Sequence, residues 1–170
     1  DMVKEYFPSV RLFPQTKNLG FAAGNNVGLR EAKGIYLLIM NPDIVVLPGA
    51  IETMVAYMRT HPSIGLLGPQ LRNPDATIQS SCARFPHLIT PWYRRTWLGR
   101  LKRGQAHISH YLMMDTDHTK PHRVDWLLGA CLITSQAHVK TVGLLDERFF
   151  LYFEDIDWCR RFAAHQFGKR

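Results

Sequence analysis

Long apolar runs are missing from this sequence of 170 residues. The longest uninterrupted one, 126–133, has eight residues and includes a glycine, whereas about 20 are needed to cross a bilayer. No basic start followed by an apolar block opens the chain, so we expect no signal peptide. Cysteine is also scarce, with three residues and no CxxC pair. These absences argue against a membrane span and a disulfide framework, and they predict reduced thiols and a cytoplasmic location.

Acidic residues are absent between positions 76 and 114, although the whole chain has 14. This segment therefore supplies +6 of the formal net charge of +7, through Arg84, Arg94, Arg95, Arg100, Lys102 and Arg103. Within it, Tyr93, Trp97 and Leu101 recur every four residues, which predicts a short helix over 91–104 with an aromatic stripe. Such a helix fits contact with an anionic membrane surface, or an exposed helix whose aromatic side chains pack on the domain.

Hydrophobic periodicity predicts strands that alternate with helices. Residues 35–40 are all apolar, which is typical of a strand buried on both faces. A helix over 22–33 precedes this strand, and a helix from Pro48 to about residue 60 follows it. The alternation predicts an α/β fold with a mostly parallel sheet flanked by helices, in one domain over 1–170. The other elements expected are strands over 64–67 and 77–84, a helix from Ser135 to Gly143, and a final helix from about Glu154.

The tripeptide Asn41-Pro42-Asp43 follows the apolar strand directly. Ligands bind at this edge of open α/β sheets, and a carboxylate there suits Mg²⁺ or Mn²⁺ shared with diphosphate oxygens. The same tripeptide recurs at 73–75 in a polar context, where a turn is the simpler interpretation. Its position after the strand, and not the tripeptide itself, therefore favours Asp43 as a metal ligand.

Three carboxylates stand within four positions of the segment FFLYFEDIDWCRR at 149–161. A helix start stabilises such charges through its dipole, and Asp157 can pair with Arg161 one turn later. The preceding apolar run is expected to bury this turn and to raise the pKa of whichever carboxylate lacks a partner. Such a buried carboxylate is a candidate general base.

Two further patterns are weaker. Gly20, Gly24 and Gly28 recur every four residues, a spacing that differs from GxGxxG and argues against a nicotinamide enzyme. These glycines allow either close approach of a ligand or tight packing of a helix on the sheet. His107 with His110, and His118 with His122, have zinc-compatible spacings, but the local sequence offers no Cys or Glu to complete either set.

Several motifs occur in order along the chain: NLGF at 18–21 with GNN at 24–26, NPD at 41–43, WLLGAC at 126–131 and FFLYFEDIDWCRR at 149–161. Together they resemble the family 2 glycosyltransferases, especially the bacterial rhamnosyltransferase-like members. The resemblance implies a GT-A-type nucleotide-diphospho-sugar transferase fold. It also implies a chain that is truncated at both ends, lacks N-terminal strands of that fold and is inactive in transfer on its own.

The resemblance also implies roles for particular residues. Asp43 matches the last acidic position of the DXD motif and would bind Mg²⁺ or Mn²⁺, while Asn41 replaces the first. Asp155 matches the base of the ED motif, with Glu154 in reserve. The implied reaction is inverting transfer of a sugar, with rhamnose the candidate, from a dTDP- or UDP-linked donor to a hydroxyl of a glycan or lipid-linked acceptor. The implied donor-binding residues are Asn18, Gly20, Gly24, Asn25, Asn41, Asp43, Trp126, Gly129 and Ala130.

Two alternatives remain open at this stage. A non-catalytic basic module that binds polyanions or an anionic membrane surface would explain the charge but not the carboxylates at 154–157. An inactive fragment that holds a sugar nucleotide is the other. We expect no nucleic acid partner. A lipid-linked acceptor would suit the basic aromatic segment 91–104 and imply peripheral contact with the inner membrane face.

Overall fold

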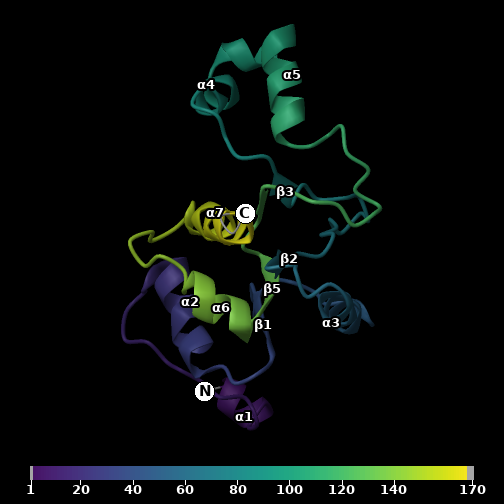
Figure 1. The fold of residues 1–170 in the computed structure, drawn as a ribbon. Helices are drawn as coiled ribbons and strands as arrows, with labels where there is room; N and C mark the ends of the chain where they lie inside the picture. The colour runs from purple at the N-terminus through teal and green to yellow at the C-terminus, as the bar shows by residue number, and fades with distance from the viewer. Residues whose placement is uncertain (1, 168–170) are drawn as a thin grey trace.

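The structure is a computed structural model that describes residues 2–167. Its centre is a sheet of three strands in the order β1–β5–β2, covered by helices on both faces (Figure 1), which confirms the α/β class. The strands are β1 (Tyr36–Met40), β2 (Leu66–Leu67) and β5 (Cys131–Ser135). The helices against them are α2 (Gly20–Glu31), α3 (Ala50–Thr60), α6 (Gln136–Val142) and α7 (Glu154–Phe167), and the short α1 (Met2–Tyr6) precedes them.

Each face of the sheet has its own core. On one face, Leu37 and Ile39 of β1 are buried in a cluster with Trp158 of α7. On the other face, Met54 of α3 is buried against Ile133 of β5. Successive side chains of a strand point to opposite faces, so an apolar run with two covered faces can fill both cores. The sheet therefore lies between α2, α6 and α7 on one side and α3 on the other.

The strand pairing corrects the prediction of a mostly parallel sheet. Both β1 and β2 pair with β5 antiparallel, with Leu38 opposite Ile133 and Leu66 opposite Thr134. β1, α3 and β2 still form the expected βαβ unit, because two strands antiparallel to the same neighbour run in the same direction. β5 lies in the gap between them. An apolar run predicts burial on two faces, but it carries no information on the direction of the adjacent strand.

Residues 84–125 leave the sheet and form a helical projection, drawn at the top of Figure 1. Its base is a ribbon of two antiparallel strands, in which Ala83 pairs with Trp126. Among the described residues, no helix here or elsewhere is both long and apolar enough to cross a membrane. The elements of this region are β3 (Cys82–Ala83), α4 (Thr90–Arg95), the 3₁₀ helix η1 (Trp97–Arg100), α5 (Lys102–Tyr111) and β4 (Trp126–Leu127).

The single helix predicted over 91–104 is wrong, because the chain turns twice within it. The first turn follows α4, where the Thr96 hydroxyl accepts a hydrogen bond from the amide of Leu98 (3.3 Å) and caps η1. Glycine permits the tight packing of these helices, since a Cβ on Gly99 would lie 1.9 Å from the carbonyl oxygen of Tyr93. The residues whose spacing of four suggested one aromatic stripe therefore lie on separate elements.

Candidate functional site

Motifs far apart in the sequence meet where β1 ends and β5 begins. The amide of Asn41 donates a hydrogen bond to the carbonyl oxygen of Ala130 (2.9 Å). The amide of the preceding residue, Gly129, donates to Oδ2 of Asp155 (3.1 Å). Gly129 and Ala130 are consecutive residues of one turn. Ala130 binds the segment that carries Asp43, and Gly129 binds the Asp155 carboxylate at the start of α7.

The loop before α7 rests on the start of α2. The amide of Phe21 donates to the carbonyl oxygen of Phe150 (2.9 Å). Gly20 has φ +80°, and a Cβ on it would lie 2.3 Å from that same oxygen, so the contact requires glycine. Its amide is held by Oδ1 of Asn18 (2.9 Å). A Cβ on Gly129 would lie 3.0 Å from the Phe21 ring, so this loop, α2 and the 129–130 turn are closely packed.

The two carboxylates at the start of α7 differ in their partners. Asp155 accepts hydrogen bonds from the amides of Gly129 and Ile156 (2.8 Å to the latter). Burial raises its pKa, and these two hydrogen bonds oppose the rise. Glu154 is also buried, and its Oε2 has no hydrogen-bond partner among the residues that the structure describes. Burial raises the pKa of Glu154, and the charge of Asp155 raises it further. Glu154 is therefore the carboxylate with an unpartnered buried oxygen.

The apolar run before these carboxylates is not what buries them. Phe150, Leu151, Tyr152 and Phe153 are all more than half exposed, contrary to the prediction that this run buries the turn. Tyr152 and Phe153 also have positive φ values of 69° and 71°, which strain the backbone of residues with a β-carbon. The strained loop turns its aromatic side chains outward, whereas the 129–130 turn contacts Asp155.

Asp43 lies on an exposed loop, and nothing in the described part of the chain forms a hydrogen bond or ion pair with its carboxylate. It also belongs to no group of three or more potential metal ligands among those residues. Mg²⁺ is commonly held by one or two carboxylates together with substrate phosphates and water. The residues present therefore fit a metal shared between Asp43 and a bound diphosphate, and they do not fit a complete protein cage.

Of the other predicted donor-binding residues, Gly24 and Asn25 lie on α2, whereas Trp126 lies on β4. Gly24 is exposed on α2, and no atom lies within 4 Å of the position of a Cβ there, so it does not serve close packing. The side chain of Asn25 donates to the carbonyl oxygen of Phe21 (2.9 Å). Trp126 is half-buried, and its indole N–H donates to the carbonyl oxygen of Arg84 (2.9 Å) at the base of the helical projection.

Asn26 has a structural role that the sequence analysis did not assign. It is fully buried, its side-chain amide donates to the carbonyl oxygen of Leu145 (2.8 Å), and its Oδ1 accepts from the amide of the same residue (3.1 Å). These bonds tie α2 to the loop that leads to α7. The available signal was its spacing of four from Ala22, which places both residues on the buried face of a helix.

A large cavity, of about 910 Å³, lies between α3 and the segment 118–127. Trp126 lines it, but Asn41, Asp43 and Asp155 do not. The convergence of motifs therefore identifies the candidate site, whereas cavity size alone would indicate a different region.

Comparison with known proteins gives relatives over most of the chain. The family profile "Glycosyl transferase family 2" matches residues 1–124. An N-acetylglucosaminyl-diphospho-decaprenol L-rhamnosyltransferase of Mycobacterium tuberculosis is 30% identical over 171 residues, which cover 89% of this chain and 52% of that protein. The low-salt glycan biosynthesis hexosyltransferase Agl10 of Haloferax volcanii is 27% identical, over 85% of this chain and 43% of its own.

Rhamnosyltransferase WbbL of Escherichia coli K12 is 26% identical, over 85% of this chain and 54% of its own. This chain thus spans about half the length of these curated relatives. No solved structure gives a significant match. The α/β architecture agrees with the GT-A fold of the matched family. With most of its length matched by the family profile, this rhamnosyltransferase-like chain belongs to glycosyl transferase family 2.

Proposed function

We propose that this chain forms the catalytic site of an inverting glycosyltransferase. The reaction moves a sugar, with rhamnose the candidate, from a dTDP- or UDP-linked donor to a hydroxyl of a glycan or lipid-linked acceptor. The observation that carries the proposal is the 129–130 turn, where Gly129 holds Asp155 and Ala130 holds Asn41. A candidate base and the segment with the candidate phosphate-binding carboxylate are thereby fixed to adjacent residues.

The donor is proposed to bind over the end of β1 and the start of α2. Asp43 would share Mg²⁺ or Mn²⁺ with the donor diphosphate, and the metal would offset the charge that grows on the departing nucleoside diphosphate. Asn41 brings an uncharged amide to the same loop. The residues proposed to contact the donor are Asn18, Gly20, Gly24, Asn25, Asn41, Asp43, Trp126, Gly129 and Ala130.

The proposed base is Asp155, with Glu154 in reserve. The carboxylate takes the proton of the acceptor hydroxyl while the hydroxyl oxygen attacks the anomeric carbon from the face opposite the diphosphate. One C–O bond forms, the bond to the diphosphate breaks, and the configuration inverts. The hydrogen bonds from Gly129 and Ile156 fix the orientation of this carboxylate, which general-base catalysis requires.

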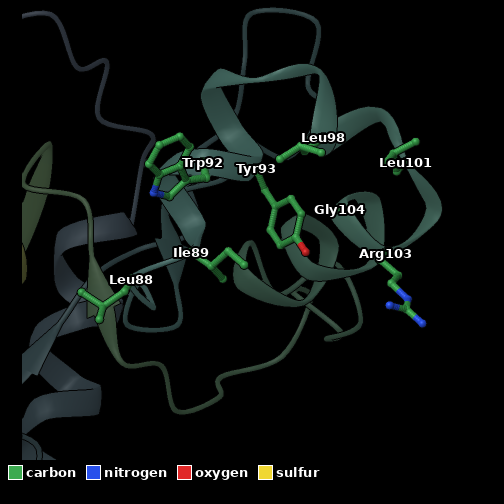
Figure 2. A pocket seen from close by; sticks show the side chains of 8 residues that line it. All are labelled: Leu88, Ile89, Trp92, Tyr93, Leu98, Leu101, Arg103 and Gly104. Atoms are coloured by element: carbon green, nitrogen blue, oxygen red, sulfur yellow. The ribbon is translucent and has the colours of Figure 1, made fainter.

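The helical projection is proposed to contact the anionic inner face of the membrane. The projection has a cavity of about 520 Å³. Figure 2 shows its lining side chains, which include Leu88, Ile89 and Trp92. Trp92 and Trp97 are 64% and 69% exposed. Interfacial helices combine such exposed aromatic side chains with basic ones that attract anionic lipids. The basic side chains here are Arg94, Arg95, Arg100, Lys102 and Arg103.

A lipid-linked acceptor would bring its reactive end to the site from such a surface. The M. tuberculosis relative is named for a diphospho-decaprenol substrate, which supports this class of acceptor. The rival interpretation, a basic module without catalysis, leaves the buried pair at 154–155 unexplained. That interpretation also leaves the turn that binds Asp155 unexplained.

Thermal unfolding of the full-length protein with a panel of nucleotide-sugars, with and without Mn²⁺, tests the proposal. A donor at about 100 times its Kd should stabilise the fold by about 2.7 kcal/mol, and the stabilising donor should then support transfer. A polyanion such as heparin serves as the control for charge alone. Steeply salt-dependent stabilisation by heparin, with none by any nucleotide-sugar, would favour the basic module.

A further inference from the structure

Cys82, His118 and His122 form a cluster outside the proposed transfer site. One potential ligand atom from each lies within 4.8 Å of the others. Cys82 belongs to β3, immediately before the helical projection, and the two histidines lie in the segment that returns from it to β4. The local sequence offered no cysteine for this histidine pair. The fold supplies one from 36 residues upstream of His118.

Hydrogen bonds to carbonyl oxygens show which ring nitrogen of each histidine carries a lone pair. Nδ1 of His118 lies 3.8 Å from Sγ of Cys82, and its Nε2 lies 2.9 Å from the carbonyl oxygen of Met113. A carbonyl only accepts, so Nε2 carries the proton and Nδ1 presents a lone pair to the sulfur. Nδ1 of His122 likewise donates to the carbonyl oxygen of Lys120 (2.9 Å), which leaves its Nε2 as the lone-pair atom. Metal-binding histidines are commonly oriented by such bonds to carbonyl groups.

We propose that Cys82, His118 and His122 bind one zinc ion, with a solvent molecule as the fourth ligand. One thiolate and two imidazoles match the preference of Zn²⁺ for sulfur and nitrogen in tetrahedral geometry. Zinc–ligand bonds of about 2.0–2.3 Å imply roughly 3.3–3.7 Å between ligand atoms. The Cys82–His118 distance of 3.8 Å is already close to this value. His122 is exposed and can close the remaining gap.

Coordination forms a Zn–S bond and releases the thiol proton to solvent. This site differs in chemistry from the one proposed at Asp43, where a hard carboxylate oxygen favours Mg²⁺ or Mn²⁺. The two metals are therefore expected to bind independently.

The position of the cluster indicates what the zinc would do. Cys82 lies just before the helical projection and His118 lies in the segment that returns from its helices. The backbone carbonyl of His118 also accepts a hydrogen bond from Gln70 (2.6 Å). A metal that joins them would close the base of the projection and fix its orientation on the sheet. The proposal thus adds a zinc ion that ties the helical projection to the sheet.

Metal binding to the full-length protein, stripped with a chelator, tests the site. We expect one equivalent of Zn²⁺ to bind and to raise the unfolding midpoint. Co²⁺ in its place should give the intense visible bands of tetrahedral geometry and a thiolate-to-cobalt charge-transfer band. Cys82→Ser should abolish the charge-transfer band and weaken Zn²⁺ binding by at least 10–100-fold, the range that outer-shell changes alone produce. Cys131→Ala and His110→Gln, which alter residues outside the cluster, serve as matched controls.

The proposal would be overturned by no Zn²⁺ binding by the unaltered protein, by an unchanged charge-transfer band in Cys82→Ser, or by equal weakening in the controls. If Cys82→Ser fails to fold, His122→Gln takes its place, because His122 is exposed and its removal should leave the metal-free protein intact. That variant should lose the Zn²⁺-dependent rise in the unfolding midpoint. Full retention of Zn²⁺ affinity in His122→Gln would equally refute the three-ligand site.

Discussion

The amide of Gly129 donates a hydrogen bond of 3.1 Å to Oδ2 of Asp155, and it does so from a position where a side chain has little room. A Cβ on Gly129 would lie 3.0 Å from the Phe21 ring and 3.6 Å from Cβ of Asp155. The carboxylate is thus positioned by a backbone group that approaches it closely because no side chain intervenes. The geometry of the candidate base depends on the packing of three separate segments.

Gly129→Ala should therefore destabilise the fold by about 1–3 kcal/mol, as overpacking does, and should also lower transfer by displacing Phe21 or Asp155. Urea unfolding measures the first effect. Gly28→Ala in α2 is the matched control, because no atom lies within 4 Å of its added Cβ. The helical propensity of alanine should make that variant more stable by about 0.5–1 kcal/mol. Equal effects of the two substitutions would contradict the packing described for the turn.

Asp43→Asn should abolish metal-dependent binding of the donor nucleotide, because an amide lacks the charge that a divalent cation requires. Isothermal titration with a nucleoside diphosphate, with and without Mn²⁺, measures this. The control is Asp75→Asn in the repeated tripeptide, where the carboxylate accepts hydrogen bonds from the amide and hydroxyl of Thr77 and only closes its own turn. Unchanged Mn²⁺-dependent binding in Asp43→Asn would exclude Asp43 as the metal ligand.

Asp155→Asn should leave donor affinity close to that of the unaltered protein and lower the rate of transfer by about 10²–10⁴, the usual contribution of a general base. Glu154→Gln should lower the rate of transfer by a smaller factor. Steady-state transfer by the full-length enzyme, together with donor binding, separates the two effects. An active Asp155→Asn beside an inactive Glu154→Gln would exchange the two roles.

Glu154→Gln should also change how stability depends on pH. Burial raises the folded-state pKa of Glu154 above its ordinary value of 4.5, so the folded protein binds this proton more tightly than the unfolded chain does. The associated stability is fully present below pH 4.5 and is lost as the pH rises through the folded-state pKa. An uncharged glutamine avoids this loss. The variant should therefore gain stability relative to the unaltered protein at neutral pH and lose that advantage in acid.

Thermal melts across pH measure this crossover, and each kcal/mol corresponds to about 2–4 °C in a domain of this size. Asp157→Asn provides the comparison, because Asp157 is paired with Arg161 at 2.8 Å and its substitution removes an ion pair. That variant should show no gain at neutral pH. A gain for Glu154→Gln that is independent of pH would mean that its charge is not the cause.

Trp92→Ala with Trp97→Ala should weaken binding to vesicles that contain anionic lipid, because both indoles are exposed on the helical projection. Replacing Arg100 with Gln should weaken the free energy of binding to such vesicles by about 1 kcal/mol and should not change binding to neutral vesicles. Co-sedimentation measures both. Ile35→Ala removes a side chain that is 78% exposed just before β1 and serves as the control. Equal binding of all variants would remove the membrane contact from the proposed function.

Local signals predicted the helices near the site well. Pro48 precedes α3 closely, and Ser135 caps α6, where its hydroxyl accepts a hydrogen bond from the amide of His138 (3.1 Å). Gly143, with φ +90°, ends that helix. α7 begins at Glu154, as its acidic first turn indicates. Caps and turn residues act over a few positions, so sequence alone is sufficient for them.

Non-local features were not accessible in the same way. The antiparallel β5 between β1 and β2, the exposed run that includes Tyr152 and Phe153, and the approach of Cys82 to His118 all depend on segments that meet only in the folded chain. Hydrophobic periodicity indicates whether a side chain is buried. It does not indicate which segment buries it. Asp155 was recognised from sequence as a candidate base, but the backbone groups that hold its carboxylate were not.

The placement of β5 also has a consequence for the order of folding. β1 and β2 do not pair with each other. Each pairs with β5, residues 131–135. During synthesis both strands leave the ribosome well before their shared partner, so no part of this three-stranded sheet can assemble until that late segment is available. We expect slow, non-local folding of this sheet, with the apolar strand β1 exposed to chaperones or to aggregation in the interval.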